Sequence, residues 1–213
     1  MKCIIMANGE YGSLDLYREI FNDTELVLCA DGGANYAWQL GIMPSYILGD
    51  MDSILPEIRE YFQEHKVLFK RYPERKDFTD TQLALERAEE AGADEIIFTG
   101  TLGKRLDHTL SNLYAGIDTV KRGKKVIHFT PECIVYLVTS QLELHGKPGE
   151  LVSILPLSDK ARGVWATGVE YVLKDAELEK ANPYAISNVI AAPDARISVS
   201  EGVLAVFHYL GNE

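Results

Sequence analysis

Tyr46-Ile47-Leu48-Gly49-Asp50-Met51-Asp52-Ser53 is an apolar run that ends in a glycine and two closely spaced aspartates. Residues 46–48 have the composition of a buried strand, and an open α/β sheet binds its ligand at the carboxyl ends of such strands. Residues i and i+2 of an extended chain point the same way, so Asp50 and Asp52 would direct two carboxylates into one small volume. Mg²⁺ is commonly held by one or two carboxylates together with phosphate oxygens and water. The alternative is a solvated turn that caps the next helix, since Asp and Ser are ordinary turn residues.

The first 130 residues alternate short apolar runs with segments of helical spacing. This alternation predicts an α/β domain in which a mostly parallel sheet is covered by helices. Strands are expected at residues 3–7, 26–30, 46–48, 67–69, 95–99 and 125–129, and helices at residues 14–21, 35–40, 55–65, 80–91 and 107–120.

After about residue 130 the runs become short and strand-like, and no long helical pattern is present. We therefore expect a boundary near Pro131, with an α/β domain over residues 1–130 and a small all-β antiparallel sandwich over residues 131–213. Residues 145–149 and 200–202 have the composition of hairpin turns. Strands are expected at residues 134–138, 141–144, 151–155, 164–166, 169–173, 196–199 and 203–209.

Composition limits the class of protein. The 213 residues are 46% hydrophobic and carry a formal net charge of −11. An acidic surface argues against nucleic-acid and anionic-membrane partners, but not against a nucleotide substrate, because a bound metal inverts the local charge. No apolar stretch approaches a membrane span, and the first apolar run is too short for a signal peptide. The three cysteines have no metal-like spacing, so a reducing cytoplasm is the simplest expectation.

Four polar segments follow strands of the predicted α/β domain. The first, Asp31-Gly32-Gly33-Ala34-Asn35, has two glycines that would let the backbone approach a ligand, before a helix with free N–H groups. A capped strand-to-helix turn explains it equally well. The glycines match neither a dinucleotide fingerprint nor a Walker A motif. The second segment is the Asp50–Asp52 pair.

The third segment runs from Arg75 to Gln82, and the fourth is Gly100-Thr101-Leu102-Gly103-Lys104-Arg105-Leu106-Asp107-His108. Thr79 and Gln82 have the spacing of a capping box, which gives both a structural role. In the fourth segment two basic side chains precede a helix, as in a phosphate-binding loop. His108 is either an acid–base group or simply a polar residue at a helix start.

Together these segments would bring many carboxylates and two cations to one edge of the sheet. Such carboxylates repel one another unless a divalent metal and a polyphosphate compensate them. The residues alone therefore indicate metal-assisted chemistry on a nucleoside triphosphate or a similar polyphosphate. The charged residues concerned are Asp31, Asp50, Asp52, Asp77, Asp80, Asp107, Lys104 and Arg105.

At these motifs the chain resembles the thiamin pyrophosphokinase family, and Gly168-Val169-Glu170-Tyr171 and Ser187-Asn188 extend the match into the second domain. The resemblance implies transfer of a pyrophosphoryl group from ATP to the hydroxyl of thiamin, with Mg²⁺, giving thiamin diphosphate and AMP. It also implies a homodimer whose active sites lie between subunits. Tyr171 would stack on thiamin, with Ser187 and Asn188 nearby.

The resemblance also implies roles for the residues of the first domain. Asp50, Asp52 and Asp80 would bind or orient Mg²⁺, and Arg105, with Lys104, would neutralise phosphate charge. Asp31 would lie near the nucleotide or the metal. The remaining candidates for nucleotide binding are Gly32, Gly33, Asn35, Lys76, Asp77, Thr79, Gly103, Asp107 and His108.

The chain departs from the family pattern at Lys104, where a glycine is frequent, and at Met51, where a phenylalanine is frequent. Residues 180–184 also lack an expected glycine. Two alternative functions remain open at this stage: a metal-dependent nucleotide pyrophosphohydrolase, and a non-catalytic regulator that binds a nucleotide or thiamin.

Overall fold

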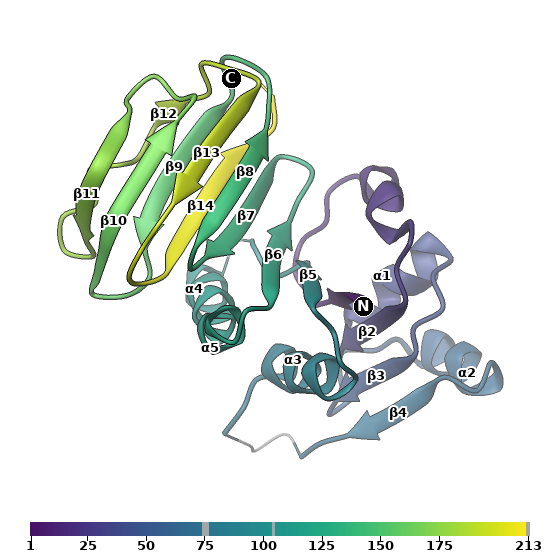
Figure 1. The fold of residues 1–213 in the computed structure, drawn as a ribbon. Helices are drawn as coiled ribbons and strands as arrows, with labels where there is room; N and C mark the ends of the chain where they lie inside the picture. The colour runs from purple at the N-terminus through teal and green to yellow at the C-terminus, as the bar shows by residue number, and fades with distance from the viewer. Residues whose placement is uncertain (74–76, 104, 212–213) are drawn as a thin grey trace. The chain divides into compact units, whose positions relative to one another are not determined.

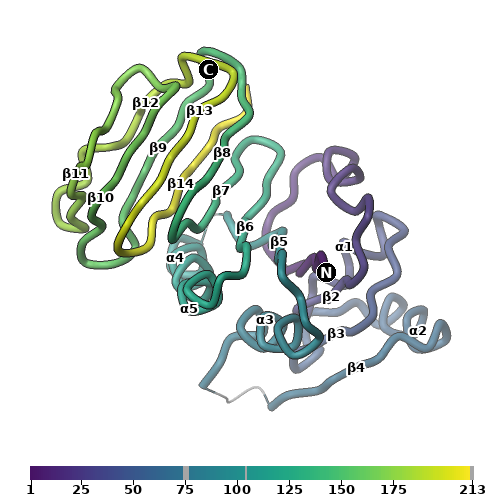
Figure 2. The backbone as a smooth tube through the Cα atoms, in the orientation of Figure 1, coloured from purple at the N-terminus to yellow at the C-terminus, as the bar shows by residue number. Residues whose placement is uncertain are grey.

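The computed structural model of the chain describes residues 1–73, 77–103 and 105–211. The chain forms two compact units, one of residues 1–115 and 128–130 and the other of residues 116–127 and 131–213 (Figures 1 and 2). The candidates Lys76 and Lys104 lie outside the described residues.

The first unit is built on five parallel strands in the order β5-β1-β2-β3-β4. The expected mostly parallel sheet is therefore confirmed. Because β2 and β5 flank β1, the order of the chain reverses between β1 and β5, which is where a sheet of this kind opens a crevice. The strands are β1 (Lys2–Met6), β2 (Leu26–Ala30), β3 (Tyr46–Gly49), β4 (Leu68–Arg71) and β5 (Glu95–Thr99).

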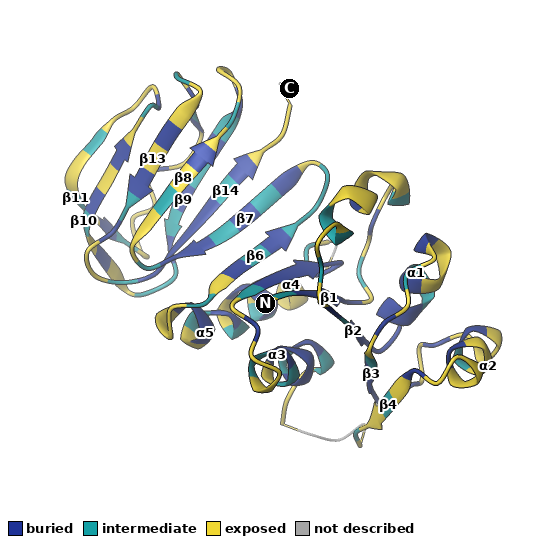
Figure 3. Ribbon diagram, turned by 45° about the vertical axis from the view of Figure 1, so that its right-hand side comes forward, coloured by how far each residue is buried: buried dark blue, intermediate teal, exposed yellow. Residues whose placement is uncertain are grey.

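Helices cover this sheet, with α3 on one face and α1 and α2 on the other (Figure 1). The central strands β1 and β2 are buried along most of their length (Figure 3). The helices of the unit are α1 (Gly33–Leu40), α2 (Pro56–Glu64), α3 (Asp80–Glu90) and α4 (Leu106–Ala115). The capping box expected at Thr79 is present: its side chain accepts from the Gln82 N–H, and the Gln82 side chain accepts from the Thr79 N–H.

Two expected helices differ in detail. Residues Leu14–Phe21 form a 3₁₀ helix (η1) in which only Tyr17 is buried, so little packing favours the longer α-helical form. The segment expected as one helix over 107–120 is two, because α4 ends at Ala115 and α5 (Ile117–Lys121) begins after Gly116, a weak helix former.

The second unit is an antiparallel sandwich, as expected. One sheet has the order β12-β9-β14-β7 and the other β11-β10-β13-β8. Ile154 and Val206 from the first sheet share one apolar core with Val164 and Ile197 from the second. The strands are β7 (Cys133–Val138), β8 (Gln141–His145), β9 (Leu151–Pro156), β10 (Lys160–Thr167), β11 (Leu173–Glu179), β12 (Asn188–Val189), β13 (Asp194–Ser198) and β14 (Leu204–Tyr209). Strand β6 (Lys125–Phe129) begins in the second unit and ends in the first, to which His128 belongs.

The hairpin turns expected at residues 145–149 and 200–202 were wrong. Each segment connects a strand of one sheet to a strand of the other, β8 to β9 and β13 to β14. Strand β11 also lies later than expected, at Leu173–Glu179, because its charged, mostly exposed residues hide the alternation that marks a strand. In the described part of the chain, no helix is long and apolar enough to cross a membrane.

Candidate active site

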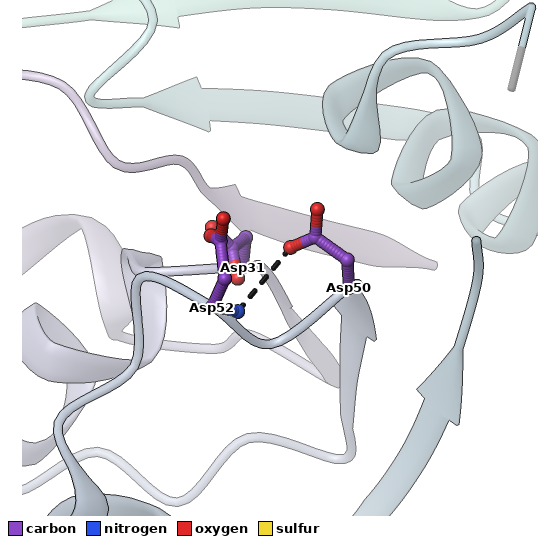
Figure 4. A group of neighbouring side chains, drawn as sticks. All are labelled: Asp31, Asp50 and Asp52. Carbon is purple, nitrogen blue, oxygen red and sulfur yellow. Dashed lines mark hydrogen bonds between the residues drawn. The ribbon is translucent and has the colours of Figure 1, made fainter. Parts of the chain in front are cut away.

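Three aspartates meet where β2 and β3 end. Asp31 follows β2, Asp50 and Asp52 follow β3, and one carboxylate oxygen from each lies within 4.8 Å of the other two (Figure 4). The Asp31 N–H donates to the Leu48 carbonyl at 2.7 Å, which fixes the first turn against the strand that carries the other two. The pairing of adjacent parallel strands therefore brings Asp31 beside Asp50 and Asp52, which lie 19 and 21 positions later in the chain.

The turn that carries Asp50 and Asp52 is not extended. Met51 has a φ of 72°, and the Asp52 N–H donates to the Asp50 carboxylate at 3.3 Å (Figure 4). The expected geometry of alternating side chains was therefore wrong, although both carboxylates do reach one small volume. The backbone instead makes a local aspartate turn, the hydrogen-bonding pattern that competes with an extended chain.

Gly49 makes room for this convergence. Its φ is 143°, and a Cβ atom at this position would lie 3.0 Å from the Asp31 Cβ and 3.2 Å from Oδ1 of Asp80. A glycine adopts this conformation without strain and leaves the space that the two side chains use. Asp80, the first residue of α3, thus borders the cluster from a third element.

The cluster is electrostatically unfavourable by itself. Asp31 is buried, and its Oδ1 has no hydrogen-bond partner among the described residues. The pKa of Asp31 is raised overall, chiefly by burial. The carboxylates of Asp50 and Asp80 also raise it, whereas hydrogen bonds from Ser53 and the Gly32 backbone lower it. An all-oxygen donor set with an unused buried oxygen fits a hard divalent cation such as Mg²⁺.

A cavity of about 680 Å³ opens beside the acidic cluster. It is bounded by the residues that follow β1, β2, β3 and β5 and by the starts of α3 and α4. Seven of the predicted site residues line it: Asp31, Asp50, Thr79, Asp80, Gly103, Arg105 and His108. The carboxyl ends of parallel strands thus bring together segments that are far apart in the sequence.

Arg105 and Asp107 form an ion pair at the start of α4. The guanidinium Nη2 donates to the Asp107 Oδ2 at 2.6 Å, and both side chains are largely exposed. The Arg105 guanidinium holds the pKa of Asp107 below its usual range, and Asp107 raises the pKa of Arg105. An incoming phosphate would compete with Asp107 for the planar donor fork of Arg105.

Other predicted residues shape the site without lining the cavity. The Asn35 side chain donates to the Ser53 carbonyl at 2.9 Å and accepts from the Leu55 N–H at 3.1 Å, so it holds the loop after the acidic cluster. A Cβ at Gly33 would lie 2.1 Å from the Met6 carbonyl oxygen, which makes this glycine a packing requirement. Gly32 likewise packs on the Asn8 side chain. Asp77 is exposed.

Sequence reasoning missed the segment after β1. Residues 7–10 line the cavity, and a Cβ at Gly9 would lie 2.1 Å from the Gly100 carbonyl oxygen. The available signal was the Asn8-Gly9 pair, which directly follows an apolar strand. Phe78 and Asn112 also line the cavity and were not singled out.

In the second unit, Tyr171 is 64% exposed, whereas Asn188 is buried. The Asn188 side chain accepts from the Tyr171 N–H at 2.9 Å and donates to its carbonyl at 2.8 Å. Asn188 therefore fixes the backbone that presents the Tyr171 ring. Ser187 has a φ of 57°, and its N–H donates to the Ser153 hydroxyl at 3.0 Å.

Comparison with known families identifies this arrangement. The family model "Thiamin pyrophosphokinase, catalytic domain" matches residues 17–128, and "Thiamin pyrophosphokinase, vitamin B1 binding domain" matches residues 139–204. The chain belongs to the thiamin pyrophosphokinase family. The resemblance drawn from the sequence motifs is thereby confirmed.

Relatives within the family are similar over most of the chain. Thiamine pyrophosphokinase of Bacillus subtilis (strain 168) is 27% identical over 96% of this chain and 97% of its own. Thiamine pyrophosphokinase 1 of Oryza sativa subsp. japonica is 24% identical over 84% of this chain and 77% of its own.

Solved structures named for the family share the fold. The crystal structure of thiamine pyrophosphokinase from Bacillus subtilis has a TM-score of 0.88 at 24% identity and covers 99% of both chains. Thiamin pyrophosphokinase from Candida albicans has a TM-score of 0.80 at 17% identity, over 98% of this chain and 90% of that one.

Proposed function

We propose that this chain transfers a pyrophosphoryl group from ATP to the hydroxyl of thiamin, producing thiamin diphosphate and AMP. The observation that carries the proposal is the convergence of Asp31, Asp50 and Asp52 beside a cavity, within a chain of the thiamin pyrophosphokinase family. In the reaction the thiamin oxygen bonds to the β-phosphorus and its hydroxyl proton is released, while the bond from the β-phosphorus to the oxygen shared with the α-phosphate breaks, so AMP leaves with that oxygen.

Positioning and charge neutralisation dominate such a transfer. A bound Mg²⁺ would supply charge neutralisation on the polyphosphate. Asp50, Asp52 and Asp80 are the residues proposed to hold it, directly or through water. The buried Asp31 is proposed to add a further negative charge beside them. Arg105 is proposed to bind phosphate oxygens through its guanidinium, released from Asp107.

The remaining predicted residues have proposed supporting roles. Gly103, Thr79 and His108 line the cavity and are proposed to contact the nucleotide. In the second unit, the exposed ring of Tyr171 is proposed to stack on thiamin. Asn188 would hold that ring in place, and Ser187 lies next to Asn188 in the chain.

We propose a cytoplasmic homodimer with shared active sites. The resemblance to the family supports the dimer, and three free, buried cysteines are consistent with a reducing compartment. Sedimentation equilibrium tests the dimer: a mass twice that of one chain is expected, and a monomer at assay concentrations would contradict it.

A product analysis separates this function from the two alternatives. The protein is incubated with ATP and Mg²⁺, with and without thiamin, and AMP and thiamin diphosphate are quantified together. Equal amounts of both products, only when thiamin is present, are expected. AMP formed equally without thiamin would indicate a pyrophosphohydrolase, and ATP binding without any AMP would indicate a regulator.

A further inference from the structure

The loop of residues 100–103 leaves β5 and lines the cavity just before Arg105. It has a glycine at each end. Gly100 has a φ of 65°, and a Cβ there would lie 2.5 Å from the Ala7 carbonyl oxygen. Because glycines give a loop the greatest backbone freedom, something else must hold this loop in one conformation.

Thr101 anchors the loop near its start, whereas Gly103 at its end donates its N–H to the Thr109 hydroxyl at 3.3 Å. Thr101 is 4% exposed and is held from two sides. The Asn112 side chain of α4 donates to the Thr101 carbonyl at 2.9 Å, and the Thr101 hydroxyl lies 2.8 Å from Nδ1 of His128 on β6. Two side chains from different elements thus fix one residue of a glycine-ended loop.

The chemistry of His128 points to the same purpose. Its ring is fully buried and stacks on Phe98, with ring centroids 4.8 Å apart and an interplanar angle of 13°. Among the described residues its Nε2 has no hydrogen-bond partner. A phenylalanine would make the same stack without an unpaired buried nitrogen, so the hydrogen bond to Thr101 is what the imidazole adds.

His128 is not suited to proton transfer. Burial lowers the pKa of His128 to about 3, so the ring is neutral at physiological pH. Among the described residues His128 does not line the cavity, but Thr101, its hydrogen-bond partner, does. A neutral ring in this place acts on a ligand by holding the loop.

We propose that His128 is a positioning residue that acts through Thr101 to hold the 100–103 loop, and Arg105 after it, in the conformation that binds the ATP polyphosphate. This proposal rests on the proposed function for the identity of the ligand. Preorganised donors gain affinity because less freedom is lost when the ligand binds.

The test compares two substitutions at Thr101. T101V removes the hydroxyl at nearly constant shape, whereas T101S keeps it. Calorimetry of ATP binding with Mg²⁺, without thiamin, should show an affinity about 5-fold weaker for T101V, the effect of one hydrogen bond, and recovery in T101S. T119V, which removes another buried threonine hydroxyl in the second unit, should leave ATP affinity unchanged.

H128F provides an independent arm, because it keeps the stack on Phe98 and removes Nδ1. It should weaken ATP binding as T101V does. The double variant T101V/H128F should bind ATP no more weakly than either single variant, since both substitutions remove the same hydrogen bond. In steady-state assays the KM for ATP should rise about 5-fold while the KM for thiamin stays within 2-fold.

Other outcomes overturn the proposal. A purely structural role would lower the melting temperature of T101V and H128F and leave ATP affinity unchanged. Equal ATP affinity in the wild type, T101S and T101V refutes this inference alone. A wild type that binds ATP but makes no AMP refutes the proposed function alone, and a wild type that does not bind ATP refutes both.

Discussion

Replacing Asp31 with asparagine should stabilise the metal-free protein while removing its activity. Asp31 belongs to two of the three carboxylate pairs in the acidic cluster, whose oxygens lie within 4.8 Å of one another. With the dielectric constant of water, each such pair is worth about 0.9 kcal/mol of repulsion, so D31N removes about 2 kcal/mol. Asparagine also tolerates the φ of 47° at this position.

The new amide group offsets part of this gain. In D31N an amide N–H group would take the position of Oδ1, which has no hydrogen-bond partner among the described residues. Burying this unpaired donor costs about 1 kcal/mol of stability. The net gain of about 1 kcal/mol corresponds to a melting temperature about 2–4 °C higher for a chain of this size. Mg²⁺ should then raise the melting temperature of the wild type more than that of D31N, because D31N has lost one of the negative charges of the acidic cluster.

Differential scanning calorimetry in chelator and in Mg²⁺ measures both effects. D118N is a matched control, because Asp118 is an exposed aspartate of α5 whose Oδ1 lies 3.8 Å from the Lys121 Nζ. It should show neither effect. A lower melting temperature for D31N in chelator, or an equal Mg²⁺ effect on D31N and the wild type, would refute the idea that this cluster is strained until a cation binds.

Three further predictions concern single positions. G49A should destabilise the fold by about 1–3 kcal/mol and slow AMP formation at least about 10-fold, because the new Cβ displaces Asp31. Gly92 also has a positive φ, of 87°, but open space around it, so urea titration of G92A beside G49A compares a strained backbone alone with a strained backbone plus displacement. Burial acts to raise the pKa of Glu150, but hydrogen bonds from the Lys147 N–H and from His208 lower it overall. The ionised carboxylate therefore stabilises the fold above pH 4.5, and this stabilisation is lost as the pH falls below that value. E150Q should flatten the pH dependence of the unfolding free energy in this acidic range, and an unchanged dependence would refute the assignment. Burial raises the pKa of the Cys133 thiol to about 11 and raises the pKa values of Cys3 and Cys29 further. The native protein should therefore react slowly with a disulfide reagent, and all three thiols should react only after unfolding. Rapid reaction of one thiol per native chain would contradict the buried placement.

The sequence was sufficient to predict the sheet and its functional edge, because both depend on local patterns. Apolar runs such as residues 26–30 and 46–48 mark buried strands, and parallel strands necessarily end at the same edge. Asp31 and Asp50 could therefore be placed together before any coordinates were known. Thr79 followed from the spacing of its capping box.

Long-range contacts and unusual backbone angles could not be predicted in this way. The left-handed φ of Met51 turns Asp52 back toward Asp50, and no local propensity of methionine indicates it. The contact of His128 with Thr101 joins residues 27 positions apart. The two hydrogen bonds by which the Asn188 side chain holds the Tyr171 backbone likewise join residues 17 positions apart.

The most direct test of the whole account is the rate of thiamin-dependent AMP formation in D50N and D52N, measured beside D118N. The account predicts that both cluster variants lose at least about 100-fold in kcat, as expected for lost electrostatic stabilisation, while their circular dichroism stays that of the wild type. D118N should retain the wild-type rate. Near-normal turnover in both D50N and D52N would contradict the assignment of this edge of the sheet as the metal-binding centre of a pyrophosphoryl transferase.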